Sequence, residues 1–155
     1  MQHAWEADMI AAIDTMTSGG TASFATSEED RPKLLVVDDV AVVRDMIALV
    51  LRKSGYLARG AASGNEARAL VALDPPALLI TDLNMPDGDG WDLIGFCRAH
   101  YPRMPILIVS GDLRGARPEI EQQADGYLNK PFGFQTLVAE VTRLLPAHQA
   151  STTAA

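Results

Sequence analysis

Short aliphatic runs recur from Lys33 onward with helix-like segments between them, and no other feature of the chain constrains its fold as strongly. Most of these runs are continuous in apolar residues instead of alternating, which is typical of parallel strands covered on both faces. Strands that alternate with helices in this way predict a doubly wound α/β fold, whose simplest strand order is 2-1-3-4-5. The expected strands are KLLVV, YLARGA, ALLI, PILIVS and GYLN.

The segments between the strands carry recognisable helix signals. A helix over about 42–53 is expected to end at Ser54 and Gly55. Ser63 and Glu66 form a capping-box pattern, which predicts a helix over 64–73. Two further helices are expected over 90–100 and 134–145.

The segment between the fourth and fifth strands departs from this regularity. Gly115 and Pro118 oppose an early helix start, whereas proline is tolerated in the first helical turn. We therefore expect a short fourth helix from near Pro118 to near Gln123, after a loose loop over 112–117.

Residues 1–32 differ in kind from the rest of the chain. An apolar stripe at helical spacing predicts a short amphipathic helix over 3–16, followed by an acidic Ser/Thr/Gly-rich linker. Two interpretations remain open: a frayed tail, or a helix that docks on the protein's own domain, a second copy or a partner. We expect a globular domain over 33–146 and a flexible tail over 147–155. The stripe consists of Trp5, Met9, Ile13 and Met16.

Charge, hydropathy and cysteine content narrow the classes of function. The net charge is −7 and no basic stripe stands out, so we expect neither nucleic-acid nor membrane binding. No apolar run approaches the roughly 18–20 residues that span a bilayer, and no secretion signal is recognisable. The one cysteine, Cys97, cannot form an internal disulfide, which fits a cytoplasmic protein. Cys97 and Trp91 are interpreted as packing residues.

Polar residues stand at the ends of four expected strands. Asp38 and Asp39 follow the first strand and Asp82 the third, while Ser110 ends the fourth and Lys130 follows the fifth. In a doubly wound sheet, ligands bind beyond the carboxyl ends of the strands, so we expect these side chains to converge. Crowded carboxylates suit Mg²⁺, and a carboxylate can attack phosphorus while a metal, an ammonium and a hydroxyl hold the phosphoryl oxygens. The set predicts a phosphoryl-transfer site.

Each of these residues also has an ordinary interpretation. Asp38 could cap the following helix, and Asp82 could belong to the turn chemistry of the LNMPDGDG segment. Ser110 could simply enter a loop, and Lys130 could lie on the surface. Their joint occurrence at strand ends on one side of the sheet favours the functional interpretation.

Four motifs in order resemble the receiver domain of two-component response regulators: VVDD, LLITDLNMPDGDGWDL, ILIVSG and YLNKPF. The resemblance covers about Lys33 to Leu145 and implies the flavodoxin-like, CheY-like (βα)5 fold. It implies that Asp82 is the phospho-acceptor. It further implies that Asp39 and Asp82 bind Mg²⁺ directly, with the backbone carbonyl of Asn84, while Asp38 acts largely through water.

The resemblance assigns further roles around the phosphoryl group. Ser110 and Lys130 would contact it, and the Lys130–Pro131 peptide bond would be cis. Tyr127 would be the switch aromatic that turns inward when Ser110 moves toward the phosphate. Asn84 and Asp112 match the two variable positions that tune the lifetime of the phosphoryl group.

These features together predict a single-domain response regulator, a signalling protein rather than an enzyme. A histidine kinase or a histidine phosphotransfer protein would donate the phosphoryl group, and a downstream protein or phosphorelay would receive the signal. Self-association is expected through the N-terminal helix or through the face of the fourth helix, fifth strand and last helix. The short fourth helix places the second of these faces in doubt.

Three alternatives remain. A Mg²⁺-dependent phosphatase with an aspartyl-phosphate intermediate would want a second acid at the position of Asn84. A flavodoxin-like FMN carrier would want a hydroxyl- and glycine-rich loop where the chain has Asp38, Asp39 and Val40. The third is a receiver that is never phosphorylated and serves as a binding adaptor.

Overall fold

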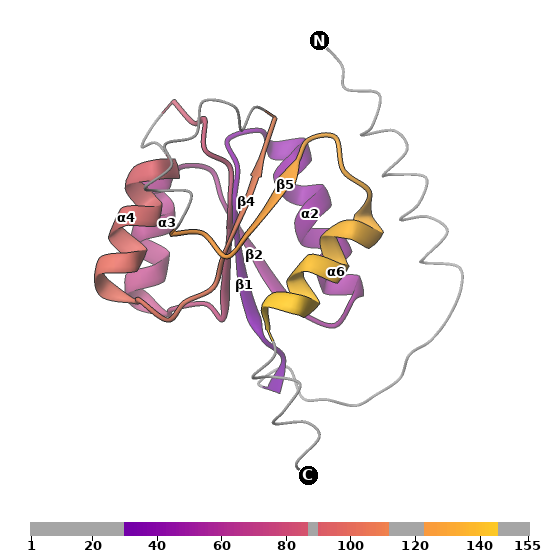
Figure 1. Cartoon of the computed structure of the whole chain (residues 1–155), viewed down its shortest axis with the longest axis horizontal. Helices are drawn as coiled ribbons and strands as arrows, with labels where there is room; N and C mark the ends of the chain where they lie inside the picture. Colours follow the sequence, from indigo (N-terminus) through magenta and orange to yellow (C-terminus); the bar gives the residue numbers. More distant parts are fainter. Residues whose placement is uncertain (1–29, 87–89, 112–122, 146–155) are drawn as a thin grey trace.

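A parallel five-stranded sheet forms the centre of the molecule (Figure 1). The computed structural model describes residues 30–86, 90–111 and 123–145. The strand order is β2-β1-β3-β4-β5, and every neighbouring pair is parallel, so the doubly wound fold with order 2-1-3-4-5 is confirmed. The strands are β1 (Lys33–Val37), β2 (Leu57–Ala61), β3 (Leu78–Thr81), β4 (Ile106–Ser110) and β5 (Gly126–Asn129).

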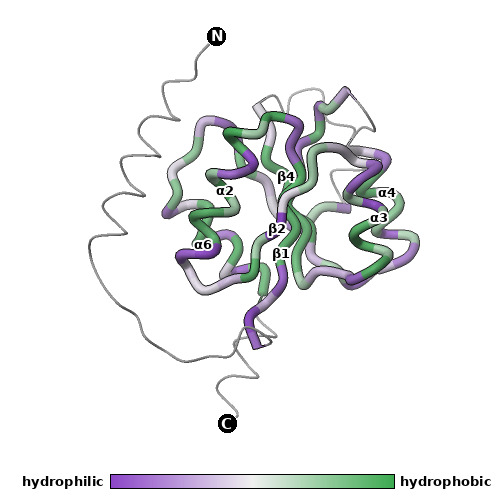
Figure 2. Tube along the Cα trace, turned by 180° about the vertical axis from the view of Figure 1, so that it is seen from behind, coloured by the Kyte–Doolittle hydropathy of each residue, from purple (hydrophilic) through white to green (hydrophobic). Residues whose placement is uncertain are grey.

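Among the described residues, helices cover both faces of this sheet (Figure 1). The helices α2 (Ala41–Lys53) and α6 (Phe134–Leu144) share one hydrophobic core with one set of strand side chains. The helices α3 (Gly64–Leu73) and α4 (Gly90–His100) share a second core with the other set. Successive strand residues point to opposite faces, so a strand inside this sandwich must be apolar at nearly every position. Figure 2 shows the hydrophobic strands between helices that carry hydrophilic outer segments.

The helix ends follow from the signals in the sequence. The Oγ of Ser63 accepts a hydrogen bond from the Glu66 N–H at 3.1 Å, and the Glu66 Oε2 accepts one from the Ala62 N–H at 2.9 Å. This reciprocal arrangement satisfies backbone donors at the start of α3 as a capping box does. After α2, Gly55 has φ +100°, a left-handed conformation that favours glycine and ends the helix.

Several expectations concern residues outside the described ranges. The short fourth helix and its preceding loop fall there almost entirely, as do the amphipathic helix over 3–16 and the tail over 147–155. Within the described ranges, no helix has the length and apolar character needed to cross a bilayer. Cys97 is fully buried in the core beneath α3 and α4, and the half-buried Trp91 packs against the same core, as expected.

Candidate functional site

The sheet register brings the strand-end residues together. Val37 and Thr81 are the last paired residues of β1 and β3, and the Asp82 N–H donates to the Val37 carbonyl at 3.0 Å. Asp38 and Asp82 therefore leave the sheet side by side. On the other side of β3, the Lys130 N–H donates to the carbonyl of Ser110 at 2.9 Å.

Three carboxylates cluster at this edge. Ligand oxygens of Asp38, Asp39 and Asp82 all lie within 4.8 Å of one another. Asp38 is 1% exposed and Asp82 is 8% exposed, whereas Asp39 faces solvent. Mg²⁺ holds its oxygen ligands at about 2.1 Å, which places opposite ligands about 4.2 Å apart. The trio therefore fits a magnesium ion with only a small contraction.

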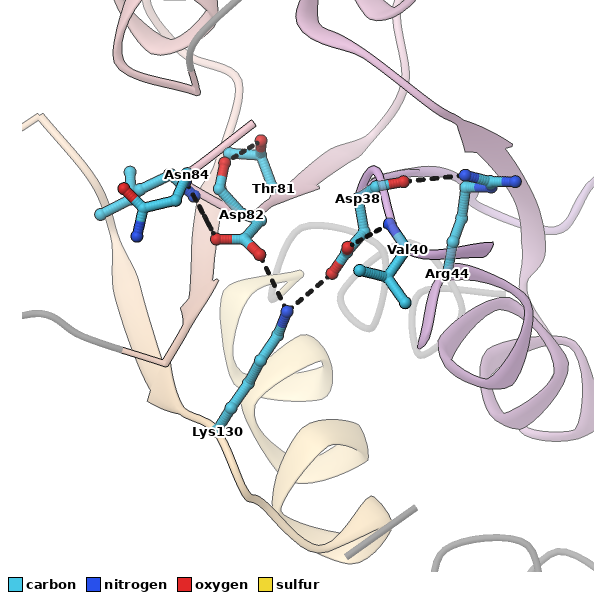
Figure 3. A network of polar contacts seen from close by, with 8 residues as sticks. Asp38, Val40, Arg44, Thr81, Asp82, Asn84 and Lys130 are labelled. Atoms are coloured by element: carbon cyan, nitrogen blue, oxygen red, sulfur yellow. Dashed lines mark hydrogen bonds and ion pairs between the residues drawn. The ribbon is translucent and has the colours of Figure 1, made fainter. Parts of the chain in front are cut away.

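The ammonium of Lys130 bridges the two buried carboxylates (Figure 3). Its Nζ donates to Asp38 Oδ2 and to Asp82 Oδ2, both at 2.8 Å. Burial alone would lower the pKa of Lys130, but the hydrogen bonds and charges of the two aspartates outweigh it and raise that pKa. Burial raises the pKa of Asp38 even though Lys130 opposes this. A single ammonium thus offsets only part of the free-energy cost of burying these negative charges. A divalent cation bound beside the carboxylates would lower that cost further.

Backbone N–H groups fix the orientation of the same carboxylates. Asp82 Oδ1 accepts from the N–H groups of Leu83 at 2.6 Å and Asn84 at 3.2 Å. Asp38 Oδ1 accepts from the Val40 N–H at 2.9 Å. Val40, not Asp38, is the N-cap residue of α2, and Asp38 bonds the N–H of Val40 ahead of the first helical turn, so the interpretation of Asp38 as the N-cap is not supported.

A buried hydroxyl lies at the end of the neighbouring strand. Ser110 is completely buried, and within the described residues its Oγ has no hydrogen-bond partner. An unpaired buried hydroxyl costs about 1–3 kcal/mol, so such a group at a ligand-binding edge indicates an acceptor that arrives with the ligand. A cleft of about 350 Å³ is lined by Asp82, Asn84, Lys130 and Gly111, the residue that follows Ser110, among others.

The remaining predicted residues take different positions. The Lys130–Pro131 peptide bond is cis, as expected. Asn84 is exposed and lines the cleft. Tyr127 does not belong to the strand-end cluster: it pairs with Ile108 on the edge strand β5 and is half-buried against the core beneath α3 and α4. Asp112 lies outside the described residues.

Two further residues support the site and were not predicted. Gly90, expected only as a turn and helix-start residue, packs so closely that a Cβ would overlap the carbonyl oxygen of Asp82. Arg44 donates from its guanidinium to the Asp38 carbonyl at 2.9 Å (Figure 3), and its side chain crosses Gly60 of β2. The sequence carries no local signal for either contact, because each joins segments that only the fold brings together.

Comparison with known proteins assigns the chain to a family. The model of the response regulator receiver domain matches residues 34–142. The transcriptional regulatory protein SphR of Synechococcus elongatus, named for alkaline phosphatase synthesis, is 38% identical over 76% of this chain and 50% of its own length. The chain thus spans half of that relative. Because SphR is named as a transcriptional regulator, the exclusion of nucleic acid is not supported.

Solved structures give the same picture. The chemotaxis protein CheY4 of Vibrio cholerae matches with a TM-score of 0.67 and 33% identity, over 74% of this chain and 99% of its own. The response regulator TrrA of Thermotoga maritima, solved in complex with Mg²⁺ and BeF, matches with a TM-score of 0.70 and 28% identity, over 74% and 99%. With the motifs, the fold and the acidic edge of the sheet, these matches show that the chain belongs to the receiver-domain family of two-component response regulators.

Proposed function

We propose that the protein accepts a phosphoryl group on Asp82 in a Mg²⁺-dependent reaction and passes the signal on through a conformational switch. The observation that carries this proposal is the meeting of two buried carboxylates on one lysine ammonium, near a buried serine hydroxyl that has no hydrogen-bond partner among the described residues. A structural salt bridge explains the first feature alone, whereas a phosphoryl site accounts for both. Asp38, Asp39, Asp82 and the backbone carbonyl of Asn84 would hold the metal.

The proposed chemical step uses these groups in distinct roles. A carboxylate oxygen of Asp82 attacks the phosphorus of a phosphohistidine or an acyl phosphate. The new P–O bond forms as the donor's P–N or P–O bond breaks, and the bonding electrons leave with the donor's imidazole or carboxylate. A bound Mg²⁺ would supply neutralisation of the charge on the phosphoryl oxygens.

The protein's own residues hold the product. Lys130 exchanges part of its contact with Asp82 Oδ2 for a phosphoryl oxygen, and Ser110 donates its hydroxyl to another. Asn84 and Asp112 would control the approach of water, which later attacks phosphorus, releases inorganic phosphate and restores Asp82. Tyr127 would turn inward as Ser110 is drawn toward the phosphate, and this movement would shift an existing equilibrium between inactive and active states.

The biological setting forms part of the proposal. A histidine kinase or a histidine phosphotransfer protein donates the phosphoryl group in the cytoplasm, and a target protein reads the result. The receiver would extend over 33–146, between an N-terminal extension over 1–32 and a tail over 147–155. Self-association would use that extension or the face that contains β5 and α6.

The test is the intact mass of the protein after incubation with acetyl phosphate. We expect a gain of one phosphoryl group that requires Mg²⁺ and is lost in Asp82→Asn. The matched control is Asp74→Asn, an exposed carboxylate that pairs with Lys33 at 2.8 Å at the other end of the sheet. It should be phosphorylated as readily as the wild type.

Each other outcome has a definite meaning. A gain that persists in Asp82→Asn would place the phosphoryl group on another residue and refute the assigned acceptor. No gain in a protein that still binds Mg²⁺ would favour the unphosphorylated adaptor. Continuous release of phosphate from an unrelated phosphomonoester would favour the phosphatase.

A further inference from the structure

A second concave surface lies at the other end of the strands from the acidic site, where the strands begin. It has a volume of about 430 Å³ and lies where β1 and β2 begin. Four of its lining side chains are cationic: Arg31, Lys33, Arg52 and Arg59. We call this surface the basic groove. Asp74 is the one acidic side chain that lines it within the described part of the chain.

The geometry of the groove sets where its charges stand. Arg52 donates from Nε to the Ala58 carbonyl at 3.0 Å, which holds its guanidinium over the start of β2. Lys33 pairs with Asp74 at 2.8 Å. Four cationic side chains against one carboxylate leave the groove positive in a protein whose net charge is −7. A positive groove of this size fits a short acidic segment.

The chain itself supplies such a segment at the correct place. Residues 1–30 contain six acidic residues and no lysine or arginine, and Arg31, the first residue of either kind in the chain, lines the groove. Glu28, Glu29 and Asp30 come immediately before it. Three extended residues reach about 10 Å, so these carboxylates are tethered within range of the groove.

We propose that the basic groove binds the acidic end of the protein's own N-terminal extension, with Glu28 and Glu29 against Arg52 and Arg59. The tether gives this segment an effective concentration in the millimolar range, which an untethered acidic peptide or free anion must exceed to compete. Because Lys33, Arg52 and Arg59 are exposed, the attraction is screened by salt. The proposal does not depend on phosphorylation, since the groove and Asp82 lie at opposite ends of the strands.

Zero-length carbodiimide cross-linking of the full chain tests this contact. Arg59→Lys keeps the charge and adds an amine that can be joined to a neighbouring carboxylate, and Arg52→Lys repeats the test at a second position. Arg68→Lys is the matched control, because Arg68 lies on α3 with its guanidinium 4.9 Å from the Phe96 ring centroid, outside the groove. A mixture of ¹⁴N and ¹⁵N protein separates links within one chain from links between copies.

We expect links from positions 59 and 52 to the peptide that contains Glu28 and Glu29, within single chains. Their yield should fall several-fold between 50 and 500 mM NaCl, because about 0.1 M salt already screens beyond about 10 Å. Glu28→Gln combined with Glu29→Gln should lower their yield several-fold, because Asp30 is then the one carboxylate left immediately before Arg31. Yields no higher than in Arg68→Lys would overturn the proposal, and mixed-isotope links would overturn it in favour of a second copy's segment. Acetyl phosphate labelling of Arg52→Gln with Arg59→Gln should match the wild type.

Discussion

Replacing Asp39 by asparagine should stabilise the metal-free protein while weakening its response to Mg²⁺. Asp39 is the exposed member of a trio whose carboxylate oxygens lie within 4.8 Å of one another. Without a metal, its charge meets two repulsive carboxylates and one attractive ammonium, Lys130. Asparagine removes the charge and keeps the shape of the side chain.

The magnitude follows from the geometry of the trio. At 4.8 Å and an effective dielectric constant of about 40, between surface protein and water, each repulsion costs about 1.7 kcal/mol. The attraction to Lys130 offsets roughly one of the two repulsions, and exposure screens what remains. Asp39→Asn should therefore raise the free energy of unfolding in EDTA by about 1 kcal/mol.

Urea unfolding in EDTA and in Mg²⁺ measures both effects. At a Mg²⁺ concentration about 100-fold above Kd, the wild type gains about 2.7 kcal/mol. A neutral amide in place of one carboxylate should raise the Kd for Mg²⁺ at least about tenfold, which reduces that gain in stability to about 1.4 kcal/mol. The control is Asp45→Asn, a carboxylate on α2 that is 78% exposed, which should stay within about 0.5 kcal/mol of the wild type. A variant less stable than the wild type in EDTA, or one with the full Mg²⁺ gain, would refute the reasoning.

Three further perturbations test other parts of the fold. Gly90→Ala should lower the free energy of unfolding by about 1–3 kcal/mol and slow acetyl phosphate labelling, because the added methyl group meets the backbone of Asp82. Gly95→Ala on the same helix places its methyl group in open space, so it should neither destabilise the protein nor slow labelling. Ser63→Ala removes the side-chain cap of α3 and should cost about 1 kcal/mol in urea unfolding, and an unchanged midpoint would contradict the capping role. Burial raises the pKa of Cys97 to about 11, so its thiol should stay neutral at pH 8 and react with iodoacetamide only after unfolding. Rapid alkylation of the native protein would contradict the burial of this side chain.

The strands could be predicted because burial on both faces leaves little choice of residue. All five residues of β4 are buried, and the sequence there is continuously aliphatic. The boundary of β2 shows where this signal weakens. Tyr56 was expected in the strand, but its N–H donates to the Leu51 carbonyl as part of the end of α2, and its hydroxyl lies 3.3 Å from that of Thr142. A backbone contact with the end of α2 therefore places Tyr56 outside the strand, which the local apolar pattern does not reveal.

The site divides in the same way between predictable and unpredictable parts. Asp38, Asp82 and Lys130 could be predicted to meet because each follows a parallel strand, and the carboxyl ends of parallel strands share one edge. Gly90 and Arg44 could not, because their roles depend on how closely α4 approaches Asp82 and on where the α2 side chains cross β2. Sequence order reveals which residues end on one edge, but not which backbone atoms then come too close for a methyl group.

The opposite ends of β1 carry opposite charge, and this gives the folded domain a permanent electric dipole along its strands. Asp38 and Asp39 of the acidic trio follow Val37, and Asp82 follows the neighbouring strand β3. Lys33 and the arginines of the basic groove surround the other end of β1, roughly 16 Å away for a five-residue strand. In the field of a charged partner such a dipole experiences a torque, which turns the domain before the two surfaces touch. Binding of a divalent cation at the acidic end would reduce the dipole. A metal-loaded receiver and a metal-free one should therefore approach the same charged partner with different preferred orientations.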